Sequence, residues 1–140
     1  MPTQSTPRRA LLASAALGAA LWLAGCAGLA PQTPEAIVEQ RADARWAYLI
    51  DGDFEKAWEF TQPGFRAVVK RERYHRRFGA GATWTGMQVH EVKCEAERCN
   101  VRLRVSAKVQ TPPFRNQEVV TYIEEVWVRE DGQWWFYQAF

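Results

Sequence analysis

The sequence predicts an α+β domain, with helices in the first half of its folded part and an antiparallel sheet in the second. Two observations carry this prediction. Up to about residue 78 apolar residues recur at helical spacing, and from residue 84 onward they alternate with polar residues, as in half-buried strands. Gly79 and Gly81 separate the two patterns. This order of elements indicates helices packed on one face of the sheet.

The first helix is predicted over residues 34–50, where several start signals coincide. Thr33 is a favourable N-cap, Pro34 is tolerated at the first helical position, and Glu35 places an acid in the first turn. Polar residues of this helix that we expect to face water are Glu39, Arg41 and Asp43. The following elements are expected to be a helix at 54–60 capped by Asp53 and stopped by Pro63-Gly64, an extended segment at 65–69 and a helix at 70–78.

The strands are expected at 84–94, 99–109, 118–129 and 134–139. The second of them shows the clearest alternation, because every second residue from Cys99 to Val109 is apolar. One face of this strand is therefore expected to be buried.

The third strand carries apolar side chains on both faces. Ile123 and Trp127 fall on one face, and Tyr122 and Val126 fall on the other. A sheet with helices on one face normally exposes its other face to water. We therefore expect the second face to be buried by another copy of the chain, in a homodimer.

Cys94 and Cys99 are separated by four residues and lie between the first two strands. A disulfide is the default for such a pair in an exported protein, where it would join the two arms of a hairpin. The spacing differs from the Cys-x-x-Cys pattern of redox-active pairs. Neither His75 nor His90 has a spacing that would complete a zinc site, and no cofactor is predicted.

The N-terminal segment has the pattern of a secretory signal, since Arg8-Arg9 precedes an apolar run. The run ends in Leu23-Ala24-Gly25-Cys26, which resembles the lipobox of bacterial lipoproteins. The resemblance implies that Cys26 carries a diacylglyceryl group, and that cleavage before it frees an amine for further acylation. The expected organisation is a signal peptide at 1–25, the lipidated cysteine and a linker at 26–33, and one domain at 34–140.

Other interpretations of this segment remain open at the level of sequence. They are a signal peptide with a chance cysteine, an uncleaved transmembrane helix over residues 10–30, and a twin-arginine export signal. Ala27 follows the cysteine where inner-membrane retention signals usually have Asp. This favours the periplasmic face of the outer membrane as the location in the cell envelope.

Length and net charge limit the number of domains and the class of partner. Removal of the first 25 of the 140 residues leaves 115, which is enough for one compact domain. This part contains 16 basic and 16 acidic residues, so its net charge is zero. No nucleic-acid partner is expected from such a balance.

Several local strings resemble the nuclear transport factor 2-like superfamily, the fold of ketosteroid isomerase and scytalone dehydratase. The likeness covers about residues 34–139 and rests on Arg45-Trp46, Gly52-Asp53, Ala57, Pro63-Gly64-Phe65-Arg66 and the ending from Trp127 to Trp135. It implies a cone with a curved sheet, as in small bacterial lipoproteins of unassigned function. It also places Tyr48 near the family's tyrosine donor, but residues 61–66 contain no acid to serve as the base.

Aromatic residues from both halves are candidates for a pocket that binds a small ligand. The candidate pocket residues are Trp46, Tyr48, Trp58, Trp84, Tyr122 and Glu124. The aromatic ones fit the hydrophobic core equally well, and core packing is the commoner role. Either Glu124 or Glu125 should point toward the helices, as an acid–base group or as the partner of a core arginine.

Charge is segregated along the helical half. Residues 35–60 carry seven acids and three bases, whereas residues 61–78 carry six bases and one acid. The basic stretch is a candidate anion-binding patch, formed by Lys70, Arg71, Arg73, Arg76 and Arg77. The alternative is an ordinary solvated helix face.

These observations favour a membrane-anchored envelope lipoprotein whose single domain is a non-catalytic binding or scaffolding module. Its expected partners are the membrane, through the lipid, and an envelope protein or an anionic ligand. The alternative function is a small-molecule enzyme or ligand carrier that uses the cone-shaped pocket.

Overall fold

The computed structural model describes residues 31–140, which contain four helical segments and four strands. The helical segments are α1 (Pro34–Ile50), α2 (Phe54–Trp58), α3 (Pro63–Val68) and the 3₁₀ helix η1 (Arg71–Arg77). The strands are β1 (Ala82–Glu95), β2 (Arg98–Val109), β3 (Glu118–Glu130) and β4 (Gln133–Phe136). The predicted signal peptide, the lipobox and most of the linker lie outside the described residues. Within the described part, none of the helices has the length and apolar character needed to cross a membrane.

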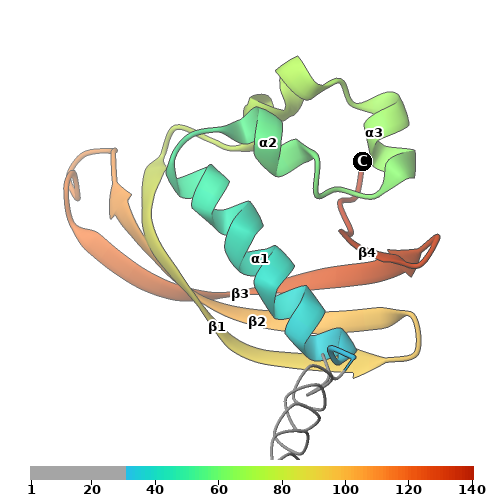
Figure 1. Cartoon of the computed structure of the whole chain (residues 1–140). Helices are drawn as coiled ribbons and strands as arrows, with labels where there is room; N and C mark the ends of the chain where they lie inside the picture. Colours follow the sequence, from blue (N-terminus) through green and yellow to red (C-terminus); the bar gives the residue numbers. More distant parts are fainter. Residues whose placement is uncertain (1–30) are drawn as a thin grey trace, which may run out of the picture. The chain divides into compact units, whose positions relative to one another are not determined.

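The strands form one antiparallel sheet in the order β1-β2-β3-β4. Figure 1 shows α1 crossing one face of this sheet, with α2 and α3 beyond it. The predicted α+β class, with helices in the first half and an antiparallel sheet in the second, is therefore confirmed.

The core lies between α1 and the sheet, as the two periodicities predict. Cys99, Val101, Leu103 and Val105 of β2 are fully buried, and the polar residues between them are exposed. The buried residues of α1 recur every three or four positions, with Arg45 and Trp46 adjacent, and form one stripe, made of Val38, Ala42, Arg45, Trp46 and Leu49. The buried faces of α1 and β2 thus pack together in one hydrophobic cluster.

The caps of the first two helices follow the sequence signals. Thr33 Oγ1 accepts a hydrogen bond from the Ala36 N–H at 3.2 Å, and α1 spans the predicted residues. Asp53 Oδ1 accepts from the Lys56 N–H at 3.1 Å. Hydrogen bonding from the Lys56 side chain lowers the pKa of Asp53 below its usual value. The second helix ends at Trp58 and is therefore shorter than predicted.

One prediction for the segment between the second helix and the sheet was wrong, and a second was confirmed only in part. The expected extended segment at 65–69 is mostly the helix α3, because Pro63 occupies its first turn behind an extended Gln62. Proline is favoured at that position, so here it opens a helix instead of ending one. The expected helix at 70–78 forms as the 3₁₀ helix η1.

The predicted disulfide is confirmed. Cys94 and Cys99 face each other across the β1–β2 hairpin, and their sulfur atoms are bonded. In the chain-entropy model a loop of this size contributes about 2 kcal/mol to stability. Because Cys99 is fully buried, the bridge joins the hairpin tip to the edge of the core.

The face of β3 that points away from α1 exposes an apolar column. Val120 and Tyr122 are each about half exposed there. Arg102 and His90 pack on the Tyr122 ring. The Cζ of Arg102 lies 4.7 Å from the centroid of this ring, and the centroid of the His90 ring lies 5.4 Å from it. The neighbouring β2 presents polar side chains on this face, so the apolar surface is one strand wide. The homodimer through this face stays a prediction.

Candidate functional site

A buried carboxylate lies at the centre of the domain. Strand β3 places Glu125 toward α1, where the residue is 4% exposed. Oε1 of Glu125 accepts hydrogen bonds from Arg45 Nη1 at 2.6 Å and from Trp46 Nε1 at 2.8 Å. Oε2 accepts from Trp127 Nε1 at 3.2 Å. Of the two roles open to this glutamate, the geometry supports pairing with a core arginine.

The arginine of this pair also contacts two further parts of the core, η1 and β4. Arg45 Nη2 donates to the Tyr74 hydroxyl at 3.1 Å, and the guanidinium carbon lies 3.7 Å from the centroid of the Phe136 ring. The Nε of Arg45 is buried and has no hydrogen-bond acceptor within the described residues. Arg45 and Glu125 therefore tie α1, η1, β3 and β4 together.

The same pair lines a cavity between α1, η1 and the sheet, with a volume of about 620 Å³, which we call the α1–sheet cleft. Its other apolar lining residues are Trp46, Leu49, Phe78, Trp84, Ile123 and Phe136, and its other polar ones are Arg76, Arg77, Glu124 and Gln138. The rings of Trp46 and Trp84 meet edge to face, with centroids 5.3 Å apart. The cleft thus combines aromatic walls with exposed arginines.

The structure divides the six predicted pocket residues. Trp46, Trp84 and Glu124 line the α1–sheet cleft, but the Glu124 side chain pairs with Arg102 on the opposite face of the sheet. Trp58 lines a second cavity. Tyr48 packs against Phe60, and Tyr122 lies on the opposite face of the sheet. Trp46 also belongs to the hydrophobic core, so it packs in the core and lines the cleft.

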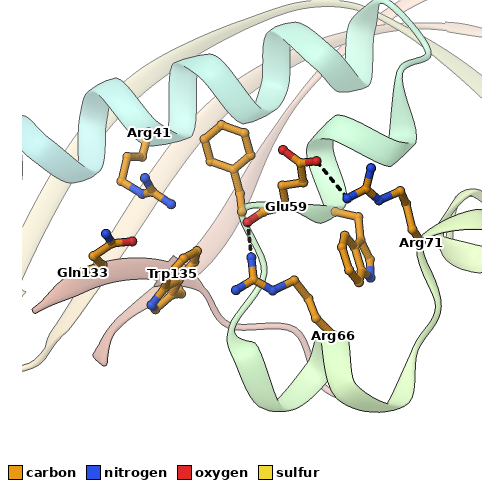
Figure 2. A pocket seen from close by; sticks show the side chains of 8 residues that line it. Arg41, Glu59, Arg66, Arg71, Gln133 and Trp135 are labelled. Carbon is orange, nitrogen blue, oxygen red and sulfur yellow. Dashed lines mark hydrogen bonds and ion pairs between the residues drawn. The ribbon is translucent and has the colours of Figure 1, made fainter. Parts of the chain in front are cut away.

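The second cavity, which we call the arginine pocket, has a volume of about 440 Å³. Its lining residues are Arg41, Trp58, Glu59, Phe60, Arg66, Arg71, Gln133 and Trp135. Figure 2 shows Arg41 reaching down from α1, while Arg66 and Arg71 approach from the segment that follows α2. Glu59 lies between Arg66 and Arg71, and Trp135 lies between Arg41 and Arg66 in this view.

Sequence reasoning missed Arg41 and Arg66 as site residues. Arg41 was expected to face water, but it lies four residues before Arg45 and packs its guanidinium against aromatic rings. Its position beside the buried stripe of α1, one turn before Arg45, is the signal that indicates this orientation.

The residues of the predicted anion patch line different cavities or none. Arg71 lines the arginine pocket, whereas Arg76 and Arg77 line the α1–sheet cleft. Lys70 and Arg73 are exposed and line neither cavity. The short 3₁₀ helix η1 therefore directs its arginines toward two different sites.

Within the part of the chain that the structure describes, the titratable side chains form no candidate metal centre. Over residues 31–140, no three or more His, Cys, Asp and Glu side chains are grouped so that they could hold a metal ion. His90 packs on Tyr122, and His75 is exposed on η1.

Comparison with known proteins shows likeness in fold alone. No protein-family model matches the sequence. No curated protein matches it either. Among solved structures, the chain is similar to a SEC-C motif containing protein from Rhodopseudomonas palustris, with a TM-score of 0.56, 19% identity and 76% of each chain covered. It is also similar to a SEC-C motif containing protein from Psychrobacter arcticus, with a TM-score of 0.56, 14% identity, and 74% of this chain and 60% of that chain covered.

These neighbours contradict the proposed resemblance to the nuclear transport factor 2-like superfamily. The similar structures are SEC-C motif containing proteins, and nothing in the comparisons supports the other family. Two of the misleading strings were local turn signals. Gly52-Asp53 joins two helices, and Asp131-Gly132 closes the β3–β4 hairpin with both residues at positive φ. Such turn chemistry recurs in unrelated α+β folds.

Proposed function

We propose that this protein is a membrane-tethered binding module whose α1–sheet cleft holds a small amphipathic anion. The tether rests on the lipobox-like end of the N-terminal segment at Cys26. The observation that supports binding is the combination, in one cavity of about 620 Å³, of aromatic walls with the exposed arginines Arg76 and Arg77. Ligand sites commonly have such an apolar lining with a few polar groups that fix orientation.

The state of the buried carboxylate favours binding over catalysis. A general base must come within hydrogen-bond reach of the proton it removes. Both oxygens of Glu125 already accept hydrogen bonds from Arg45, Trp46 and Trp127. The alternative, a small-molecule enzyme, would need another acid or base, and the other carboxylate at the cleft, Glu124, directs its side chain to the opposite face of the sheet, where it pairs with Arg102. A ligand carrier needs no such group.

The cleft can be tested with 1-anilinonaphthalene-8-sulfonate, an aromatic anion whose fluorescence rises in apolar sites. We expect saturable binding by the full-length chain. Replacing both rim arginines, Arg76→Gln with Arg77→Gln, should weaken it about tenfold, because two charge-assisted contacts are lost. Arg73→Gln is the matched control, since Arg73 lies on the same 3₁₀ helix and lines neither cavity. Equal affinity of all three proteins would refute the cleft as the anion site.

The tether is tested separately, by Cys26→Ser. This change removes the thiol that the lipid would occupy, so we expect the protein to lose lipid labelling and to leave the membrane fraction or remain unprocessed. Metabolic labelling with a fatty acid and fractionation of cells measure both effects. Cys99→Ser, which breaks the disulfide but leaves the lipobox intact, serves as the control and should retain the label. Unchanged labelling of Cys26→Ser would exclude this cysteine as the anchor.

A further inference from the structure

The arginine pocket contains more positive charge than its own side chains neutralise. Three arginines and one glutamate line it. Glu59 pairs with Arg71, with Oε1 and Nη2 3.1 Å apart, and Arg66 Nη1 donates only to the Glu59 backbone carbonyl, at 2.6 Å. Throughout residues 31–140, no carboxylate forms an ion pair with Arg41 or Arg66. Two positive charges therefore remain in the pocket.

Aromatic rings hold these guanidinium groups in place. Arg41 lies over Phe60 and Trp135, with its Cζ 5.1 and 5.2 Å from the ring centroids. Arg66 lies 4.5 Å from the centroid of the same Trp135 ring, on which both cations pack. A guanidinium that stacks on an aromatic ring keeps its N–H groups available for hydrogen bonds in its own plane. The pocket thus presents oriented donors.

Arg41 supplies the clearest indication of an anion-binding site. Its Nε is buried and has no acceptor within the described residues, although a buried polar atom is normally paired. Burial, and secondly the nearby charge of Arg66, lower the pKa of Arg41. The energetic reason is that a positive charge is held in a partly dry site beside another positive charge. An anion between these two arginines would relieve both costs.

We propose that the arginine pocket binds a phosphate monoester. Such a group carries a charge of about −1.5 to −2 near neutral pH and offers three acceptor oxygens, which matches the two unpaired positive charges. Guanidinium groups suit its geometry because they can donate two parallel hydrogen bonds to phosphate oxygens. The cavity of about 440 Å³ has room for the phosphoryl group and a small organic part. This site shares no residue with the α1–sheet cleft and does not depend on the tether.

Inorganic phosphate is the first probe, added to the full-length chain in a non-ionic detergent. The intrinsic fluorescence should respond saturably, because Trp58 and Trp135 line the pocket. We expect Arg41→Gln to weaken binding at least about tenfold. Arg104→Gln removes an exposed arginine of β2 and should bind as the unmodified chain does. Acetate, a monoanion, should bind more weakly than phosphate by at least a similar factor.

Thermal unfolding separates ligand binding from a structural role of Arg41. Phosphate should raise the unfolding temperature of the unmodified chain and of Arg104→Gln, but not that of Arg41→Gln. Without phosphate, Arg41→Gln should unfold at the same or a higher temperature, since it removes a charge that Arg66 repels. A marked fall instead would show that Arg41 is retained for packing, and would overturn its assignment to an anion site.

Two phosphate monoesters distinguish the source of the ligand. Each ester is tested as a competitor of inorganic phosphate. If glycerol 3-phosphate competes as well as dioctanoyl phosphatidic acid or better, the ligand is a soluble phosphorylated molecule. The reverse order indicates a lipid headgroup. The Arg76→Gln, Arg77→Gln double variant should bind both as the unmodified chain does, because the cleft is a separate site. Failure of phosphate and both esters to bind, or equal binding by Arg41→Gln, would overturn the proposal while leaving the cleft untouched.

Discussion

Glu125→Ala is expected to lower the free energy of unfolding by about 3–5 kcal/mol, the usual cost of removing one partner from a buried ion pair. The physical reason is the charge that remains. Arg45 is 2% exposed and would lose its carboxylate, and the indole N–H of Trp46 would lose its acceptor in the same place. Urea unfolding followed by circular dichroism measures the change.

Glu124→Ala is the matched control, one residue away on the same strand. The Glu124 side chain is 65% exposed and pairs with Arg102 across 3.5 Å, so its loss should change stability by no more than about 0.5 kcal/mol. The double variant Arg45→Met, Glu125→Leu should recover most of the stability lost in Glu125→Ala, because no unpaired charge is left inside. Similar effects of Glu124→Ala and Glu125→Ala would mean that the buried pair contributes little.

Regular periodicity explains which parts of the fold the sequence predicts. The alternation from Cys99 to Val109 leaves only one face of β2 that can be buried, and the apolar stripe of α1 likewise defines one buried face. Both predictions were confirmed. Between them, Pro63 was interpreted as a stop signal although proline also opens helices, so α3 was missed. Short elements contain too few residues for a period to be recognised, and their conformation depends on what they pack against.

The site was predicted less completely, because the position of a charged residue in the sequence does not determine where its side chain points in the fold. The alternation along β3 indicates that one of two adjacent glutamates faces inward, but not which one, since a register shift of one residue exchanges them. The arginines of η1 are neighbours in sequence and divide between two cavities in the structure. Arg41 comes from a distant helix, and only tertiary packing brings it beside Arg66.

Trp127→Ala is expected to destabilise the domain by about 3–5 kcal/mol, as large-to-small changes of buried aromatic residues do. Trp127 is fully buried and is among the largest side chains of the core. Removing the indole would leave a cavity beside Phe136, whose ring centroid lies 6.0 Å away, and would take one hydrogen bond from Glu125. Chemical denaturation provides the measurement.

The comparison that isolates the role of this indole is Trp135→Ala, which removes the same side chain from β4. Trp135 is partly exposed, and its Nε1 donates to the Glu130 carbonyl at 3.3 Å, so its loss should cost no more than about 1 kcal/mol. Trp127 donates to Glu125, which lines the α1–sheet cleft, and its ring lies 6.0 Å from the guanidinium of Arg41 in the arginine pocket. Trp127→Phe keeps a ring and removes the N–H, so it should weaken the anchoring of Glu125 while largely preserving the packing. A stability for Trp127→Phe as low as that of Trp127→Ala would show that the hydrogen bond, and not the volume, dominates.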